Sequence, residues 1–134
     1  MNRHVATVRV RYAETDRMNV VHHASYIVWF EVGRSELMRA AGIPYRELED
    51  AHGLLFPVIE VGATYRQPAA YDEELEVRTT CTTLSPVRVR FDYEIARPGS
   101  DQVLAAGFTV HACVGRETGR LARMPAWLME RLAP

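Results

Sequence analysis

The sequence predicts an α+β domain in which one five-stranded antiparallel sheet curls around a long helix. One early stretch, residues 24–41, has helical spacing, and five runs of strand character account for most of the remaining chain. The strands need an apolar partner for their inward faces, and this helix is the longest element available. With 134 residues, 48% of them hydrophobic and 25% charged, we expect a single folded domain, 1–134.

The first strand is expected over Val5–Tyr12, where apolar and polar residues alternate. Its buried face would carry Val8, Val10 and Tyr12. A loop, residues 13–22, then leads to the long helix. Asn19 marks a tight bend in this loop, because Asn tolerates the left-handed backbone conformation better than most residues.

The long helix is predicted because apolar residues recur at steps of three and four. They are Tyr26, Ile27, Phe30, Leu37, Met38 and Ala41. Trp29 widens the apolar surface, so we expect the helix to be largely enclosed. Gly42 ends it, and a second, short helix is expected over Pro44–Ala51, closed by Gly53.

Beyond Gly53 the chain is predicted to be mostly strand. The expected strands are Leu55–Arg66, Glu74–Leu84, Val87–Ala96 and Gln102–Val114. The last is the longest and most apolar, so we expect it to be central in the sheet, before a short final helix, Pro125–Leu132. Open strand edges favour pairing with a second copy, which makes a homodimer the expected assembly.

Composition argues against several classes of function. The net charge is −1 with both signs mixed along the chain, which is not the pattern of a nucleic-acid-binding protein. No apolar run has the length of a membrane span and the N-terminus lacks a signal-peptide core, so a cytoplasmic protein is expected. Cys81 and Cys113 are expected to be buried free thiols. The scattered His4, His52 and His111 have no metal-ligand spacing, and we expect no metal.

Chemistry-bearing residues concentrate directly before the long helix. Glu14, Thr15 and Asp16 form an acidic triplet, and His22 and His23 follow within seven residues of it. A carboxylate can attack a carbonyl carbon or activate water. A helix N-terminus carries free N–H groups and a partial positive charge, which can stabilise an oxyanion. Together these are the components of an acyl-transfer site.

This stretch resembles the signature of hotdog-fold acyl-CoA thioesterases. The matching pattern is Tyr12-x-Glu14-Thr15-Asp16-x-x-Asn19-Val20-Val21-x-His23-Ala24-Ser25-Tyr26, then Phe30-Glu31. The group it resembles is the 4-hydroxybenzoyl-CoA thioesterase-like one, which includes short acyl-CoA thioesterases associated with the Tol-Pal cluster. A second stretch, Tyr65-Arg66-x-Pro68-Ala69-x-x-Asp72-x-x-Leu75-x-Val77, is similar to that group's second strand and turn. The resemblance implies a hotdog fold, paired into a dimer and often a tetramer, with active sites at the dimer interface.

The resemblance also implies the reaction and its residues. An acyl-CoA would be hydrolysed to a free acid and CoA, with no cofactor apart from the CoA of the substrate. The family's acidic residue falls on Asp16, as nucleophile or general base, and its loop-to-helix residue on His23, at the oxyanion site. Substrate contacts are expected from the helix start and from basic residues facing the CoA phosphates, namely His22, Ala24, Ser25, Tyr26, Arg88 and Arg90.

Some assignments stay open at this point. Arg120 and Arg123 are further candidates for the CoA phosphates, Glu14 is expected to be a solvated loop residue, and Glu31 is expected to reach from the helix toward the loop. A hydratase or dehydratase of the same fold would use a different acid/base pair and keep the thioester bond. A non-catalytic acyl-CoA-binding module would bind without turnover. Release of free thiol separates hydrolysis from both alternatives.

Overall fold

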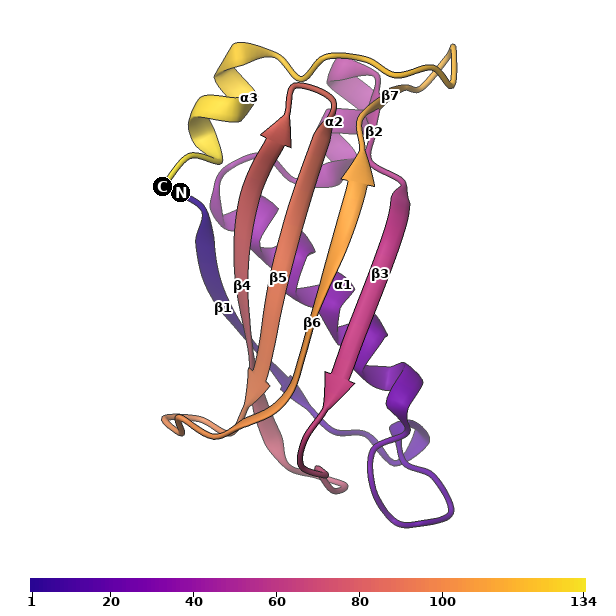
Figure 1. Ribbon diagram of the computed structural model, residues 1–134, viewed down its shortest axis with the longest axis vertical. Helices are drawn as coiled ribbons and strands as arrows, with labels where there is room; N and C mark the ends of the chain where they lie inside the picture. The colour runs from indigo at the N-terminus through magenta and orange to yellow at the C-terminus, as the bar shows by residue number, and fades with distance from the viewer.

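The computed structural model describes residues 1–134 and has the expected sheet curled around a long helix (Figure 1). The order of elements is β1 (Arg3–Arg9), the 3₁₀ turn η1 (Tyr12–Glu14), α1 (His23–Ala40), α2 (Tyr45–His52), β2 (Leu54–Leu55), β3 (Val58–Tyr65), β4 (Glu74–Ser85), β5 (Arg88–Ala96), β6 (Val103–Ala112), β7 (Val114–Gly115) and α3 (Ala126–Arg131). The predicted α+β class is confirmed.

The main sheet has five antiparallel strands in the order β1-β4-β5-β6-β3. Cys81 of β4 lies opposite Phe91 of β5, and Tyr93 of β5 lies opposite Gly107 of β6. The strand expected to be central, β6, has a neighbour on each side, but the middle position belongs to β5. The two edge strands are β1 and β3, and β2 pairs with β7 in a separate small ribbon.

Three predicted strands differ from the structure, and the last of them, Gln102–Val114, is divided at Cys113 between β6 and β7. β1 ends at Arg9, and Tyr12 lies in the following 3₁₀ turn with 79% of its surface exposed, so its predicted burial is wrong. There its ring packs edge-on against Tyr71 instead. The run predicted as Leu55–Arg66 is divided into β2 and β3 around Pro57, whose missing N–H group cannot continue a ladder.

The helix ends fall within one residue of their predicted positions. α1 begins after His22, whose Nδ1 accepts the N–H of Ala24 at 3.2 Å. Gly42, with φ of +81°, ends α1, and Gly53, with φ of +63°, ends α2. Both glycines adopt the left-handed conformation that is costly for residues with a Cβ. None of the three α-helices combines the length and apolar character needed to cross a membrane.

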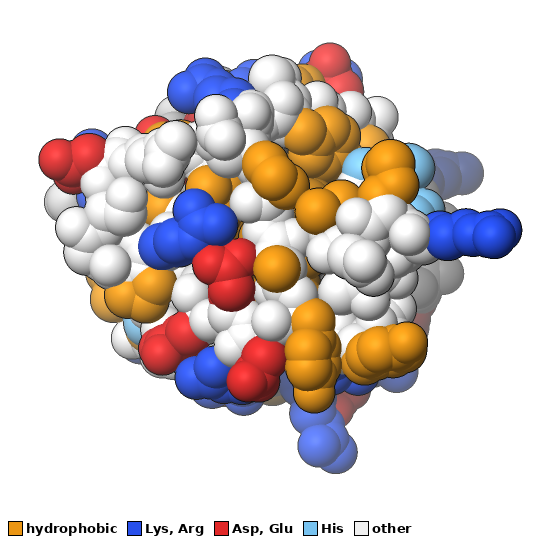
Figure 2. Space-filling model, turned by 90° about the horizontal axis from the view of Figure 1, so that it is seen from below, with side chains coloured by type: hydrophobic (Ala, Val, Ile, Leu, Met, Phe, Trp, Pro, Cys, Tyr) orange, Lys and Arg blue, Asp and Glu red, His pale blue; other side chains and the backbone are white.

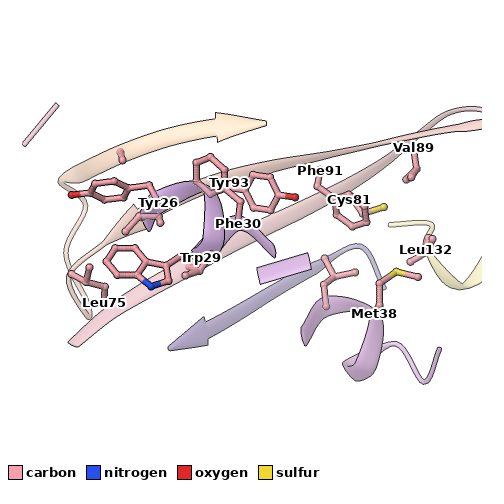
Figure 3. Packing of buried hydrophobic residues seen from close by; sticks show 14 of the residues in the cluster. Tyr26, Trp29, Phe30, Met38, Leu75, Cys81, Val89, Phe91, Tyr93 and Leu132 are labelled. Carbon is pink, nitrogen blue, oxygen red and sulfur yellow. The ribbon is translucent and has the colours of Figure 1, made fainter. Parts of the chain in front are cut away.

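α1 lies close against the concave face of the sheet because small residues allow it. A Cβ atom on Gly33 would come within 2.6 Å of Val77 and would also collide with Thr79, both on β4. Phe30 stacks on Tyr93 of β5 with a centroid distance of 4.4 Å and planes 5° apart (Figure 3). The expected enclosure of α1 is confirmed only for one face: Tyr26, Trp29, Phe30, Gly33, Leu37 and Met38 are buried. The opposite face reaches the surface, where Val28 is 53% exposed.

The far end of the molecule is packed with aliphatic and sulfur-containing side chains. In Figure 3, Met38 of α1 lies near Leu132 and Cys81. Cys81 and Cys113 are free and buried, as predicted. Burial raises the pKa of the Cys81 thiol to about 12 and that of Cys113 to about 11, so neither has thiolate character at neutral pH.

Candidate active site

The loop between η1 and α1 is a closed turn that presents Asp16. Thr15 and Val21 form a β-bridge at its base, and the N–H of Asp16 donates to the Val20 carbonyl at 2.9 Å. The N–H of Asn19 donates to the Asp16 carbonyl at 3.0 Å, and Asn19 has a φ of 64°. The predicted left-handed bend is therefore present, and it folds the loop back on itself.

The Asp16 carboxylate is partly exposed and only half engaged by the protein. Its Oδ1 atom accepts the N–H of Met18 at 2.8 Å, which fixes the direction of the side chain. Its second oxygen accepts no hydrogen bond from the protein. One oxygen is therefore oriented by the backbone while the other is free to meet a water molecule or a carbonyl carbon.

Asp16 opens onto a cavity of about 330 Å³ between the loop, the start of α1 and the end of β3. The residues lining it are Asp16, Met18, Val20, Val21, His23, Tyr26, Tyr65, Arg66, Gln67 and Pro68. Figure 2 views the molecule from this end, where histidine side chains reach the surface beside hydrophobic ones. A partly apolar cavity with a few polar groups at one side is typical of a small-molecule site.

The first turn of α1 leaves one backbone donor free at this cavity. The N–H of Ser25 donates to the His22 carbonyl at 2.9 Å, and the Ala24 N–H is bound by the His22 ring. The His23 N–H has no acceptor within the protein. Because the helix N-terminus also carries partial positive charge, this N–H is suited to hold a developing oxyanion.

Glu14 is buried, so the expectation of a solvated loop residue is wrong. Only 7% of its surface is exposed, and its Oε2 atom accepts the indole N–H of Trp29 at 3.0 Å. Its Oε1 atom accepts the backbone N–H of Arg11 at 2.7 Å, and the Arg11 guanidinium lies 3.4 Å away. The 3₁₀ turn brings the carboxylate to α1, where Trp29 offers a donor fifteen residues along the chain.

The residues predicted around the helix start have different surroundings. Tyr26 and His23 line the cavity with Asp16, and burial raises the pKa of Tyr26. His22 and Ala24 are exposed next to it but are not part of its lining. Ser25 donates from Oγ to the Glu14 carbonyl at 3.3 Å, which makes it a local structural contact in this chain.

Arg88 and Arg90 are not brought to the cavity within one chain. Tyr65, at the cavity, pairs with Ala105 of β6, whereas Arg88 pairs with Ala112, seven residues further along that strand. At about 3.3 Å per residue the separation along the sheet is roughly 20 Å. Arg90 forms an ion pair with Asp92 at 3.0 Å and lies over the Phe108 ring. Contact between these arginines and a substrate stays a prediction.

Sequence reasoning missed the contribution of β3 to the cavity. Tyr65 donates its hydroxyl to the His23 carbonyl at 3.0 Å, and Arg66 is the only basic residue in the cavity lining besides His23. The stretch with Tyr65, Arg66 and Pro68 resembles the thioesterase group. That resemblance alone does not indicate that the end of β3 lies against the start of α1.

The histidines outside the site have structural surroundings. The His111 ring is 1% exposed, with Nδ1 2.8 Å from the Phe56 carbonyl and Nε2 2.8 Å from the Thr109 hydroxyl. Burial lowers the pKa of His111 to about 4, so the ring is neutral at pH 7. No three His, Cys, Asp or Glu side chains are grouped so that they would hold a metal ion.

Comparisons with known proteins extend over almost the whole chain. A model of the thioesterase-like superfamily matches residues 10–132. YneP of Bacillus subtilis (strain 168), named as a candidate acyl-CoA thioesterase, is 36% identical over 111 residues, which are 83% of this chain and 79% of that protein.

Solved structures with the same fold include several at 30% identity or more. A hypothetical protein of Thermus thermophilus is 43% identical, with a TM-score of 0.86 over 97% of this chain and 95% of its own. The DHNA-CoA thioesterase of Staphylococcus aureus is 30% identical, with a TM-score of 0.83 over 92% of this chain and 81% of its own. The similarity therefore includes the Asp16 loop, α1 and all five strands of the main sheet.

Proposed function

This chain belongs to the thioesterase-like superfamily, and we propose that it is an acyl-CoA thioesterase whose site is the cavity at Asp16 and His23. The names of its relatives support hydrolysis of acyl-CoA thioesters as the reaction class. A fold of this kind hosts more than one activity, so the assignment of residues rests on the cavity and not on kinship.

Asp16 performs the chemistry at the thioester carbonyl. Its carboxylate either attacks the carbonyl carbon or takes a proton from the water that attacks it. The C–S bond breaks and the CoA thiolate leaves with the bonding electrons. In the first route the acyl group forms a mixed anhydride with Asp16, which water then hydrolyses; in both routes the products are the free acid and CoA.

The observation that carries this proposal is the meeting of two groups at one cavity. The Asp16 carboxylate has one unengaged oxygen, and the His23 N–H has no protein acceptor. A carbonyl placed between them would have its carbon facing the carboxylate and its oxygen facing the helix N-terminus. Such donors are typically worth about 10²–10³ in rate.

The cavity favours a compact acyl group. Its volume is about 330 Å³, and Tyr26, Tyr65, Met18 and Val20 provide aromatic and apolar surface. An aromatic or short acyl group fits within such a space. The S. aureus structure, whose name specifies a DHNA-CoA substrate, is consistent with an aromatic acyl group for this chain as well.

We propose that the chain forms a homodimer through β3 and that two such dimers form a tetramer. β3 is an edge strand whose Val58, Ile59, Val61 and Tyr65 are each 45–50% exposed, an apolar row beside unpaired backbone groups. Light scattering tests this directly, since it should give two or four times the mass of one chain.

The test of the activity is free-thiol release from short, medium, long and aromatic acyl-CoAs. Asp16→Asn should lower kcat by about 10³-fold or more, with KM and oligomeric mass unchanged. The matched control is Asp72→Asn, because Asp72 also lies in a loop but outside the cavity; unlike Asp16 it has a positive φ, of 69°. Asn suits that conformation, so this variant should keep full activity.

Each other result has a definite meaning. Turnover that survives Asp16→Asn would remove the site but keep the enzyme. Binding without thiol release from any substrate would indicate the binding module. A product that keeps its thioester bond would indicate the hydratase.

A further inference from the structure

The geometry points to Glu14 as the positioning residue of this site, a role beyond the reaction proposed above but resting on it. Glu14 does not line the cavity and touches no reacting atom. It joins the loop that carries Asp16 to the helix that carries the His23 N–H. We propose that the carboxylate of Glu14 sets the distance and angle between these two groups.

The side chain of Glu14 holds two separate elements at once. One oxygen accepts the backbone N–H of Arg11, just before η1, at 2.7 Å. The other accepts the indole N–H of Trp29, two turns into α1, at 3.0 Å. Trp29 is itself 2% exposed and packs edge-on against Tyr26 of the cavity. The carboxylate is therefore clamped between the entry to the loop and the buried face of the helix.

The backbone of Glu14 makes a second connection to the start of α1. Its carbonyl accepts the N–H of His22 at 2.8 Å and the hydroxyl of Ser25 at 3.3 Å. His22 directly precedes the free N–H of His23, and Asp16 lies two residues after Glu14. Four hydrogen bonds through one residue thus tie both reacting groups to a common point.

A carboxylate at this buried position lowers stability, so its presence calls for a reason other than packing. A buried ionised group lowers stability unless hydrogen bonds and a counter-charge compensate it. The only nearby cation is Arg11, whose side chain is 73% exposed, so the compensation is weak. An apolar side chain would avoid this cost but would leave the buried indole N–H of Trp29 without an acceptor. A carboxylate instead offers two acceptor oxygens in a fixed plane, which suits orientation of two donors.

The experiment separates positioning from folding. Glu14→Gln keeps the shape but turns an NH₂ group toward one of the two donors. It should lower kcat by about 10- to 100-fold and change KM less than about three-fold, because misplacement of reacting groups acts on the chemical step. Trp29→Phe should act in the same direction, and the double variant should lose less than the product of the two effects.

The matched control is Glu76→Gln. Glu76 also accepts one backbone N–H, from Gly99 at 3.0 Å, and pairs with one arginine, Arg78 at 3.3 Å, but it lies on β4 away from the cavity. The kcat of Glu76→Gln should stay within two-fold of the value for the parent chain. A spectroscopic readout uses Trp29 emission in a Trp127→Phe background, where Trp29 is the only tryptophan; it should shift in Glu14→Gln alone.

Amide hydrogen exchange decides the matter even without turnover. The N–H groups of His22 and Met18 should exchange at least about ten-fold faster in Glu14→Gln and unchanged in Glu76→Gln. An active parent with unchanged kcat and unchanged exchange in Glu14→Gln would overturn the positioning role alone. An inactive parent would overturn the proposed function, while faster exchange in that case would still support the connection. Lower stability with unaltered kcat in folded protein would reduce Glu14 to a packing residue.

Discussion

The two ends of α1, whose course is seen in Figure 1, differ in which side chains are buried and which are exposed. At the start of the helix, His22, His23 and Ala24 are exposed. There the Glu14 carbonyl accepts the N–H of His22, and the Tyr65 hydroxyl donates to the His23 carbonyl. At the other end Leu37 is fully buried, and α2 and α3 cover that end with buried leucines, Leu48 and Leu128 among them.

The difference separates the two tasks of the helix. Within a helix, free N–H groups exist only at the N-terminus, so a site that uses them must leave this end uncovered. Uncovered elements contribute little apolar burial, and stability has to come from elsewhere. In this chain the other end of α1, which we call the closed end, supplies such burial through Leu37, Leu48 and Leu128. We call the start of α1, with His22, His23 and Ala24, the open end. Substitutions at the closed end should therefore change stability, and substitutions at the open end should change turnover.

Leu37→Ala is expected to have the largest effect at the closed end. Removing a fully buried leucine should lower the free energy of unfolding by roughly 3 to 4 kcal/mol, because the remaining cavity cannot collapse completely. The kcat of the folded fraction should stay within two-fold. Urea unfolding and thiol release measure the two quantities. Leu121→Ala, at a residue 63% exposed, is the control and should change neither. A large loss of kcat in Leu37→Ala would contradict the separation.

His111 should make the closed end sensitive to pH. Burial lowers its pKa from 6.5 to about 4, so between these values the unfolded chain binds a proton that the folded chain does not. The contribution of His111 is fully present above pH 6.5 and is lost as the pH falls toward 4. The expected loss across that window is about 3 kcal/mol.

Urea unfolding between pH 7 and pH 4.5 measures how the free energy of unfolding changes with pH. In His111→Gln this change should be smaller. Carboxylates contribute in a lower window. The Arg97 hydrogen bond lowers the pKa of Glu73 below 4.5, and the Gly99 N–H does the same for Glu76. Their stabilisation is lost only as the pH falls below that value. If the free energy of unfolding of His111→Gln changed with pH above 4.5 as much as that of the parent chain, another group would be titrating there.

The closed end and the sheet could be predicted from sequence because their causes are local. In β4 and β5 strict alternation puts Val77 and Tyr93 inside, and both are at most 1% exposed. Gly42 and Gly53 stop helices through their own backbone freedom. Tyr12 followed the same alternation but lies beyond the end of the strand. Periodicity cannot report where a ladder stops when the stop depends on the partner strand.

The open end could be predicted only in part. Asp16 and His23 were assigned from their motif, and the structure brings both to one cavity. Glu14 was misassigned because its burial depends on Trp29, fifteen residues away on another element. Arg66 was overlooked in favour of Arg88, because charge is visible in a sequence but the end of the sheet to which a charge belongs is set by strand register.

Arg66→Ala tests which arginine serves the open end. Arg66 forms no ion pair in the protein, so its guanidinium is free to meet a CoA phosphate at the cavity. The substitution should raise KM for acyl-CoA about ten-fold and leave kcat unchanged, since a charge-assisted hydrogen bond is lost in substrate and transition state alike. KM for the corresponding acyl-pantetheine, which has no phosphate, should not change. The reverse result, with KM raised by Arg90→Ala only, would support the original assignment.

Tyr65→Phe should give the smallest effect and tests how finely the open end is set. The substitution removes one partly exposed hydrogen bond, from the Tyr65 hydroxyl to the His23 carbonyl at 3.0 Å, and keeps the ring packed against Tyr26. A neutral hydrogen bond contributes about 0.5–1.5 kcal/mol, and exposure places this one at the lower limit. We expect kcat to fall about three-fold and the free energy of unfolding to change by less than about 0.5 kcal/mol. Tyr71→Phe is the control, because Tyr71 contacts Tyr12 and lies outside the cavity. If Tyr65→Phe instead lowers stability and spares kcat, the open end also carries folding energy and the division between the two ends of α1 fails.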